Sequence, residues 1–378
     1  MQFDPEVGYV LRNYLPREGV DGSFTISTVQ ANGARTSFMY AHRKPRINTY
    51  GDSFTQCQQV NDGETWQEYL AAHLGEPIGN YGVGGHGVYQ AYRRMIRQEK
   101  TASGAEYLIL YIWGNDSIRS LVRCFRTMAY PVMNRMYAGR SAYMFHGNFW
   151  SNIEIDLDTG LFVEKNSRLP TIESVYRMTD PQWMVENLRD DVALQLHAYS
   201  QEYIGDLNRE LVDKLARHLN FTFDWSQESG WRSQAQALLD RYSLGATRYI
   251  LEKANAFARQ NGKKLMIVLN DPYRVMMAQL KNPGTPRYDQ EIVDYLVKEH
   301  FTYFDMNEAH LLDFRKYNLS HSDYAKLYLI GHYNPRGNHF FAFSIKDKIV
   351  EWLDPKPVTY RQRDDQTFDY RDYLQVPQ

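Results

Sequence analysis

A serine and a histidine that lie far apart in the sequence stand in motifs that together fit acyl-transfer chemistry. Residues 51–55 (GDSFT) place Ser53 after a glycine, which permits the tight turn that presents a nucleophilic hydroxyl. Residues 331–337 (GHYNPRG) place His332 ahead of an expected helix. A histidine within hydrogen-bonding reach can take the proton of a serine hydroxyl as the oxygen attacks a carbonyl. Alone, each motif is more often an ordinary turn or a structural histidine, so neither is sufficient.

Two further motifs contain groups that could donate hydrogen bonds to an anion. Residues 80–87 (NYGVGGHG) form a glycine-rich turn, and such turns let backbone N–H groups converge on negative charge. A phosphate-binding loop is the alternative interpretation, but the Lys-Ser/Thr ending of that motif is missing. Residues 114–116 (GND) follow an expected strand, and the side-chain amide of Asn115 could donate into the same space.

Taken together and in this order, the four motifs resemble the SGNH/GDSL hydrolase family over about residues 46–116 and 262–352. The resemblance implies that Ser53 is the nucleophile and His332 the general base. It implies an oxyanion hole made by the backbone N–H of Gly85, with Gly84 as the alternative, and by the side chain of Asn115. The expected substrate-binding residues at the same edge are Asp52, His86 and Asp116.

The resemblance breaks at one position that matters for catalysis. The family usually has an aspartate two or three residues before the histidine, and this chain has Ile330 and Leu329 there. The acid that orients the imidazole is therefore missing locally, and replacing such an acid can cost roughly 10⁴ in rate. Substitutes that remain open are a backbone carbonyl or one of three aspartates from neighbouring loops, Asp271, Asp305 and Asp323. A slow enzyme, or a protein that binds without catalysis, also remains open.

The elements that must position these motifs alternate between strand and helix patterns. Buried strands are predicted at residues 46–50, 78–83, 107–113, 264–270 and 301–306, and helices at 64–74, 88–98 and 335–353. Such alternation predicts a parallel sheet with helices on both faces, and sites in open sheets form at the carboxyl ends of the strands. We therefore predict a flavodoxin-like three-layer α/β/α sandwich of about five parallel strands.

The chain is expected to divide into a core and three additions. Residues 1–45 are predicted to be an N-terminal β excursion, with strand-like pieces at 23–30 and 35–41. The hydrolase core is predicted at 46–116 and 245–353. A large, mainly helical insertion at 117–244 is expected to roof the site, with helical patterns at 190–219 and 233–260. Residues 354–378 form a polar C-terminal tail.

The amino-acid composition limits which kinds of binding partner and which cellular location are expected. The 378 residues are 43% hydrophobic and 23% charged with a formal net charge of −2, which favours a soluble globular protein and no nucleic-acid partner. No uncharged apolar stretch approaches the roughly 20 residues of a membrane span. The first eight residues do not resemble a secretory signal, so the expected location is the cytoplasm. Cys57 and Cys124 define no disulfide framework, and no cluster has metal-binding spacing, so no metal and no cofactor are predicted.

The expected activity is hydrolysis of a small-molecule ester through an acyl-serine intermediate. The 29 tyrosines suit a wet binding cleft, so a small polar or carbohydrate ester is the expected substrate. Two alternatives stay open: an acyltransferase that uses the same serine, and a catalytically weakened binding protein. The acyl group, the leaving group and the oligomeric state stay undetermined.

Overall fold

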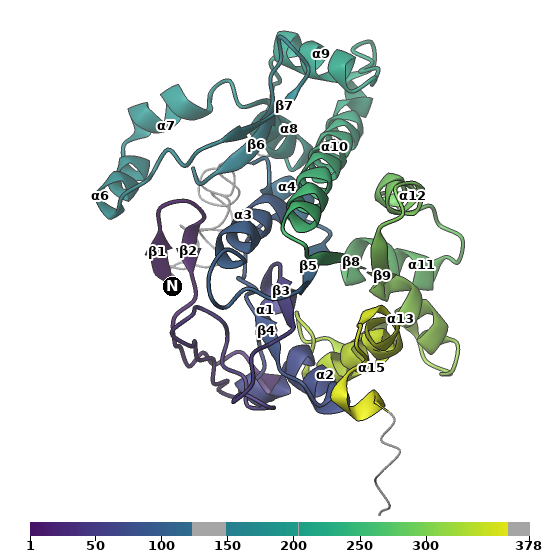
Figure 1. Cartoon of the computed structure of the whole chain (residues 1–378). Helices are drawn as coiled ribbons and strands as arrows, with labels where there is room; N and C mark the ends of the chain where they lie inside the picture. Colours follow the sequence, from purple (N-terminus) through teal and green to yellow (C-terminus); the bar gives the residue numbers. More distant parts are fainter. Residues whose placement is uncertain (123–148, 203, 362–378) are drawn as a thin grey trace, which may run out of the picture.

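A five-stranded parallel sheet forms the centre of the molecule (Figure 1). The computed structural model describes residues 1–122, 149–202 and 204–361. The strands lie in the order β4 (Ile78–Asn80), β3 (Ile47–Tyr50), β5 (Tyr107–Trp113), β8 (Lys264–Asn270) and β9 (Thr302–Asp305). Counted along the chain within this sheet, the order is 2-1-3-4-5, the flavodoxin-like arrangement. The predicted fold class is confirmed.

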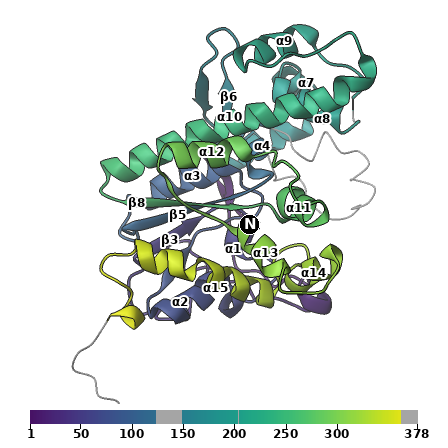
Figure 2. The same cartoon turned by 90° about the vertical axis from the view of Figure 1, so that its right-hand side faces the viewer.

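Helices cover both faces of the sheet, as Figure 2 shows. One face carries α3 (Val88–Gln98), α10 (Trp231–Gln260) and α12 (Gln290–Lys298). The other carries α2 (Trp66–Leu74), α13 (Met306–Phe314), α14 (His321–Tyr328) and α15 (Pro335–Trp352). The shorter helical segments of the described residues are α1 (Ser53–Gln56), α4 (Asp116–Arg119), α11 (Met277–Lys281), Val20–Gly22, Asp62–Glu64, Tyr176–Thr179, Glu228–Gly230, Pro272–Met276 and Val358–Tyr360.

Strands β5 and β8 are apolar over most of their length because both of their faces are covered. In β5, Leu108 and Leu110 pack under α3 and α10, whereas Ile109 and Tyr111 pack against α2 and α15. A parallel strand buried on both sides has a near-continuous apolar sequence. This explains why the predicted bounds of β5 and β8 match the observed ones.

The N-terminal excursion departs from its prediction. Its strands are β1 (Gln2–Asp4) and β2 (Gly8–Val10), which form an antiparallel pair. The expected strands at 23–30 and 35–41 are wrong, since these segments form only isolated bridges. Part of the reason is that backbone donors are used elsewhere. The N–H groups of Ile26 and Thr28 donate to the side chains of Asn61 and Asp62 and not to a neighbouring strand.

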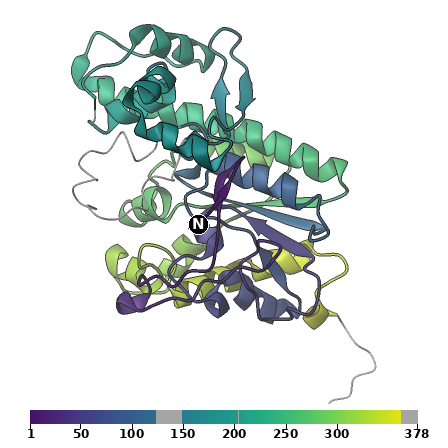
Figure 3. The same ribbon diagram turned by 90° about the vertical axis from the view of Figure 1, so that its left-hand side faces the viewer.

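The insertion stacks on the outer side of α3 and α10 (Figure 3). It contains the hairpin of β6 (Asn152–Ile155) and β7 (Phe162–Lys165) and the helices α6 (Ile172–Val175), α7 (Pro181–Leu188), α8 (Val192–Ser200) and α9 (Arg209–His218). The helical pattern expected at 190–219 is thus two helices. The predicted boundary at 244/245 falls inside α10, whose 30 residues belong to both parts. Residues 123–148 of the predicted insertion and 362–378 of the predicted tail lie outside the described residues.

None of the described helices combines the length and the apolar character needed to cross a lipid bilayer.

Candidate active site

Ser53 and His332 meet at the carboxyl edge of the sheet. Ser53 is the first residue of α1, directly after β3, and His332 lies in the loop between α14 and α15. His332 Nε2 is 2.8 Å from Ser53 Oγ. The Ser53 side chain is nearly buried, with the residue 7% exposed. Two groups that the sequence places far apart are therefore directly hydrogen-bonded.

The glycine before this serine is required by packing. A Cβ atom on Gly51 would lie 2.2 Å from Thr55 Oγ1 and 2.9 Å from the backbone oxygen of Tyr111. Both distances are shorter than any ordinary carbon contact, so only glycine fits between β5 and α1. The sequence suggested glycine here because it permits a tight turn. The structure requires glycine because α1 and β5 approach too closely for a side chain.

The group that orients His332 is Gln59. Gln59 Oε1 lies 3.0 Å from His332 Nδ1 and 2.7 Å from the backbone nitrogen of His332. A backbone N–H can only donate, so the side-chain atom facing it must be the amide oxygen and not the amide nitrogen. His332 Nδ1 therefore carries a proton, which leaves Nε2 free of one and able to accept the proton of the Ser53 hydroxyl.

The aspartates expected to fill this position are occupied elsewhere. Asp271 accepts hydrogen bonds from the backbone N–H groups of Tyr273 and Arg274 and from the Tyr288 hydroxyl. Asp305 forms an ion pair with Arg287. Asp323 lies on the surface with Ser320 and Lys326. None of the substitutes left open by the sequence is the partner of His332 Nδ1 in the described residues; that partner is Gln59, which was not among them.

The turn that carries Gln59 is built around a buried arginine. After α1 ends at Gln56, the backbone is left-handed at Cys57 (φ 59°) and again at Gln59 (φ 74°). The guanidinium of Arg35 donates to the backbone oxygens of Gln56, Cys57 and Val60, each at 2.6 Å. These contacts hold the irregular turn from inside the molecule.

The glycine-rich loop passes beside the nucleophile. A Cβ atom on Gly84 would lie 3.5 Å from Ser53 Cβ. The N–H of Gly84 donates to Gln56 Oε1 at 2.8 Å, and its oxygen accepts from the Tyr9 hydroxyl at 2.8 Å. Gly85 follows with a left-handed backbone (φ 84°), and its N–H has no hydrogen-bond partner among the described residues. Of the two glycines expected to donate to an oxyanion, Gly85 is the one with an available N–H.

Asn115 starts the loop after β5. It precedes α4, and its backbone oxygen accepts from the N–H of Arg119 at 3.0 Å. Its side-chain amide makes no hydrogen bond within the described parts of the chain and is half-buried. An amide without an internal partner is available to a ligand.

Two buried carboxyl groups lie beneath Ser53. Asp52 Oδ1 caps α1 through the N–H of Phe54 at 2.9 Å, and Asp52 Oδ2 is 3.5 Å from Ser53 Oγ. Asp116 accepts from the N–H of Trp113 at 3.0 Å and pairs with Arg119 at 3.2 Å. Burial raises the pKa of Asp52 to about 6, against the opposing effect of Arg119. Burial, and next the charge of Asp52, raise the pKa of Asp116 well above its usual range.

This burial does not fit the expectation that Asp52, Asp116 and His86 contact a substrate. Both aspartates are almost fully inaccessible. His86 is 2% exposed, packs on the Tyr9 ring and contacts the Tyr9 backbone oxygen through Nε2 at 3.1 Å. The three side chains support the loops around Ser53 from within.

The imidazole of His332 is neutral at physiological pH. Burial lowers the pKa of His332 to about 4, and the positive charge of Arg119 acts in the same direction. A neutral imidazole is the form that can accept a proton. The arrangement can therefore deprotonate a serine hydroxyl beside a backbone N–H and a side-chain amide.

An aromatic wall flanks the histidine. The Phe54 ring lies 4.9 Å from the His332 ring and 5.9 Å from the Trp113 ring, centroid to centroid. Tyr273, which is 45% exposed, packs edge-on against Trp113 and contacts the backbone oxygen of Gly331 through its hydroxyl. No group of three or more His, Cys, Asp or Glu side chains in the described residues is arranged to hold a metal ion.

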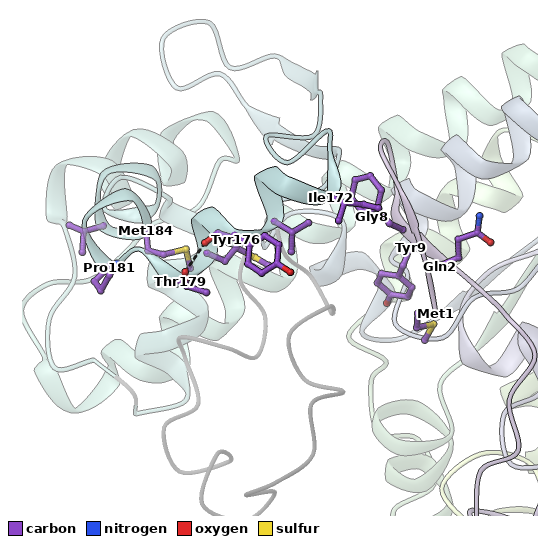
Figure 4. A pocket seen from close by; sticks show the side chains of 13 residues that line it. Met1, Gln2, Gly8, Tyr9, Ile172, Tyr176, Thr179, Pro181 and Met184 are labelled. Carbon is purple, nitrogen blue, oxygen red and sulfur yellow. Dashed lines mark hydrogen bonds between the residues drawn. The ribbon is translucent and has the colours of Figure 1, made fainter.

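A separate apolar cavity of about 640 Å³ lies between β1–β2 and the segment from α6 to α7 (Figure 4). Its walls include Phe3, Tyr9, Ile172, Tyr176 and Met184. Ser53 and His332 are not among its lining residues. Tyr9 connects the two places, because its ring borders the cavity and its hydroxyl donates to the glycine loop.

About half of the tyrosines in the described residues, which had suggested a sugar-binding cleft, are core residues. Twelve of them are buried: Tyr9, Tyr50, Tyr81, Tyr89, Tyr92, Tyr107, Tyr111, Tyr199, Tyr242, Tyr324, Tyr328 and Tyr333. Their number therefore reflects packing and gives no support to a carbohydrate substrate.

Comparisons with known proteins add one distant structural likeness. No protein-family model matches the chain, and no curated protein matches it. One solved structure that is similar is a member of the lipolytic protein G-D-S-L family from Veillonella parvula DSM 2008. The identity is 11%, the TM-score is 0.34, and the match covers 80% of this chain and 96% of that chain. At this level of similarity, the chemistry of this chain has to be argued from its own residues.

Proposed function

We propose that this chain is a serine hydrolase of the SGNH/GDSL kind that cleaves a carboxylic ester through an acyl-Ser53 intermediate. The observation that carries the proposal is the 2.8 Å contact between Ser53 Oγ and an imidazole nitrogen whose partner nitrogen is held in the protonated form. Serine activation by a hydrogen-bonded, correctly oriented histidine is the common element of such hydrolases.

The first half of the reaction acylates the serine. Ser53 Oγ attacks the ester carbonyl carbon while His332 Nε2 takes the proton of the Ser53 hydroxyl. The resulting oxyanion is stabilised by the N–H groups of Gly85 and Ser53 and by the Asn115 amide. The carbon–oxygen bond to the alcohol then breaks, and the proton on Nε2 passes to the departing oxygen.

The second half releases the acid. Water replaces the alcohol, His332 Nε2 takes a proton from it, and its oxygen attacks the acyl carbon. The bond to Ser53 Oγ breaks, and the proton returns to the serine. No metal or cofactor takes part in these steps.

The neutral imidazole and the preformed hydrogen bond support an enzyme over a protein that kept the scaffold but lost the chemistry. Such a protein would not need His332 held in the tautomer that faces Ser53 with an unprotonated nitrogen. Here Gln59, whose amide oxygen also accepts from the backbone N–H of His332, holds the imidazole in that tautomer.

The test uses p-nitrophenyl esters of graded acyl length, together with acylated sugars, and three proteins. The wild type is expected to hydrolyse at least one ester, and Ser53→Ala is expected to lose that activity while keeping its fold by circular dichroism. Ser233→Ala, a surface serine at the start of α10, is the matched control and should retain wild-type rates.

A fluorophosphonate probe provides a second readout that needs no substrate. We expect mass spectrometry to locate the label on Ser53 in the wild type and to find none in Ser53→Ala. Equal hydrolysis by wild type and Ser53→Ala, or a wild type that neither hydrolyses nor labels, would refute the proposal.

A further inference from the structure

We propose that Gln59 is a positioning residue of this reaction, a neutral acceptor that replaces the missing acid and holds His332 in the productive tautomer. The assignment rests on two hydrogen bonds to one atom: Gln59 Oε1 accepts from the backbone N–H of His332 at 2.7 Å and from its Nδ1–H at 3.0 Å. The kinetic part of the inference depends on the proposed function, whereas the tautomer and its cause do not.

The backbone N–H of His332 overcomes the usual weakness of an amide in this position. An amide can present either its oxygen or its NH₂ group, and in a serine triad an amide that presents NH₂ stabilises the wrong histidine tautomer, which costs roughly 10⁴ in turnover. Here the same amide also faces a backbone donor. Turning NH₂ toward His332 would place two donors against each other, so the oxygen orientation is selected.

The path of the chain fixes Gln59 in this place. Its own backbone is left-handed (φ 74°), and its side chain reaches the His332 loop on the far side of the site. On the other side, a Cβ atom on Gly331 would lie 3.0 Å from Gln59 Oε1, and Gly331 has a left-handed backbone (φ 113°). A glycine before the histidine thus leaves room for the glutamine, and Arg35 fixes the turn behind it.

Burial, and next the charges around His332, determine the pH range in which its imidazole is neutral. Arg119 on α4 opposes protonation of the imidazole. The carboxyl groups nearby are Asp52, next to Ser53, and Asp116, which pairs with Arg119. The Tyr273 hydroxyl contacts the backbone oxygen of Gly331, the residue before His332. None of them contacts Nδ1, whose only partner within the described part of the chain is the uncharged Gln59. A carboxylate at position 59 would be the nearest negative charge, so it should stabilise the imidazolium and make His332 titrate at higher pH.

The kinetic test compares Gln59→Glu, Gln59→Ala and the neighbouring control Gln58→Ala, whose side chain bonds Glu18 instead of His332. Gln59→Glu should retain activity at pH 8 and move the acid limb of kcat/KM upward by roughly 1–3 pH units. Gln59→Ala should lose roughly 10²-fold or more in kcat with little change in KM. Gln58→Ala should keep the wild-type kcat and the wild-type position of the acid limb of kcat/KM.

Nuclear magnetic resonance of ¹⁵N-histidine-labelled full-length protein gives a readout independent of turnover, with the His332 signals assigned by their loss in His332→Ala. Wild type should show a protonated Nδ1 and an unprotonated Nε2, and Gln59→Glu should raise the midpoint of the His332 titration. An unmoved titration in Gln59→Glu, or a proton on Nε2 in the wild type, would overturn the assignment. A wild type that neither hydrolyses esters nor labels with the fluorophosphonate probe, with these spectra intact, would refute the proposed function but not the assignment of Gln59. Because glutamate is nearly isosteric with glutamine, this variant tests the idea even where Gln59→Ala does not fold.

Discussion

Arg35 and Asp62 form an ion pair of 2.8 Å whose side chains are 1% and 3% exposed. The same guanidinium donates to three backbone oxygens of the turn that ends in Gln59 and Val60. A charge pair at the centre of an irregular turn thus determines where the partner of His332 lies.

Removing this arginine should destabilise the fold strongly. Arg35→Met leaves the Asp62 carboxylate and three carbonyls buried without their partner, and breaking a buried pair in this way typically costs about 3–5 kcal/mol. The free energy of unfolding from denaturant titration measures the loss. Lys326→Met, which breaks an exposed pair with Asp323, is the control and should cost less than about 1 kcal/mol. Equal effects of the two substitutions would contradict the prediction.

Asn115→Ala should reduce turnover and leave stability nearly unchanged. The proposed role of its amide is to donate to the oxyanion, and losing one such donor typically costs roughly 10²–10³ in kcat. The side chain makes no hydrogen bond within the described residues, so the melting temperature should stay close to that of the wild type. Steady-state kinetics and thermal melts measure both quantities. A wild-type kcat would remove Asn115 from the proposed mechanism.

Gly114→Ala should destabilise the protein. A Cβ atom there would lie 1.8 Å from Asp271 Oδ2 and 2.8 Å from the Tyr288 hydroxyl oxygen, so this buried hydrogen-bonded pair would have to move. Forcing an atom into such a site typically costs about 1–3 kcal/mol. Gly205→Ala is the matched control, because a Cβ atom at that position meets nothing within 4 Å. Thermal melts of the two variants give the comparison, and a Gly114→Ala protein as stable as Gly205→Ala would contradict it.

His310 should make the fold sensitive to acid. The His310 ring lies between the hydroxyls of Tyr324 (3.1 Å) and Tyr333 (2.7 Å), and burial lowers the pKa of His310 to about 3. Below the ordinary histidine pKa of about 6.5, the unfolded chain takes up a proton that the folded state does not. The free energy of unfolding should therefore fall as pH falls from 6.5 toward 3, by at most about 1.4 kcal/mol per pH unit from this group.

The variant His310→Phe isolates this contribution. It should be less stable than the wild type at pH 7, because the hydroxyls of Tyr324 and Tyr333 each lose their hydrogen bond with the His310 ring, and the difference should shrink as pH falls. Denaturant titrations at several pH values measure both curves. Curves that stay parallel between pH 7 and pH 4 would show that His310 does not cause the acid sensitivity.

The sequence by itself determined the strands and helices whose pattern is local and whose burial is complete. β5, β8 and α3 have the predicted bounds because an apolar strand covered on both faces, or a helix with one apolar side, shows its environment directly in its residue pattern. The motifs of Ser53 and Asn115 follow predicted strands, and the carboxyl ends of parallel strands share one edge. His332 lies between α14 and α15 and not at a strand end, so its meeting with Ser53 was implied by the family resemblance.

Only the tertiary structure decided what completes the site. A glutamine has no pattern that marks it as the partner of a histidine. Gln59 is such a partner for two reasons. Arg35 stabilises the turn with left-handed backbone that contains Gln59, and the backbone N–H of His332 can donate only to the amide oxygen. The burial of Asp52, Asp116 and His86, and of twelve tyrosines among the described residues, was equally invisible in the sequence. These features depend on contacts between residues far apart along the chain, and such contacts exist only once the layers have packed.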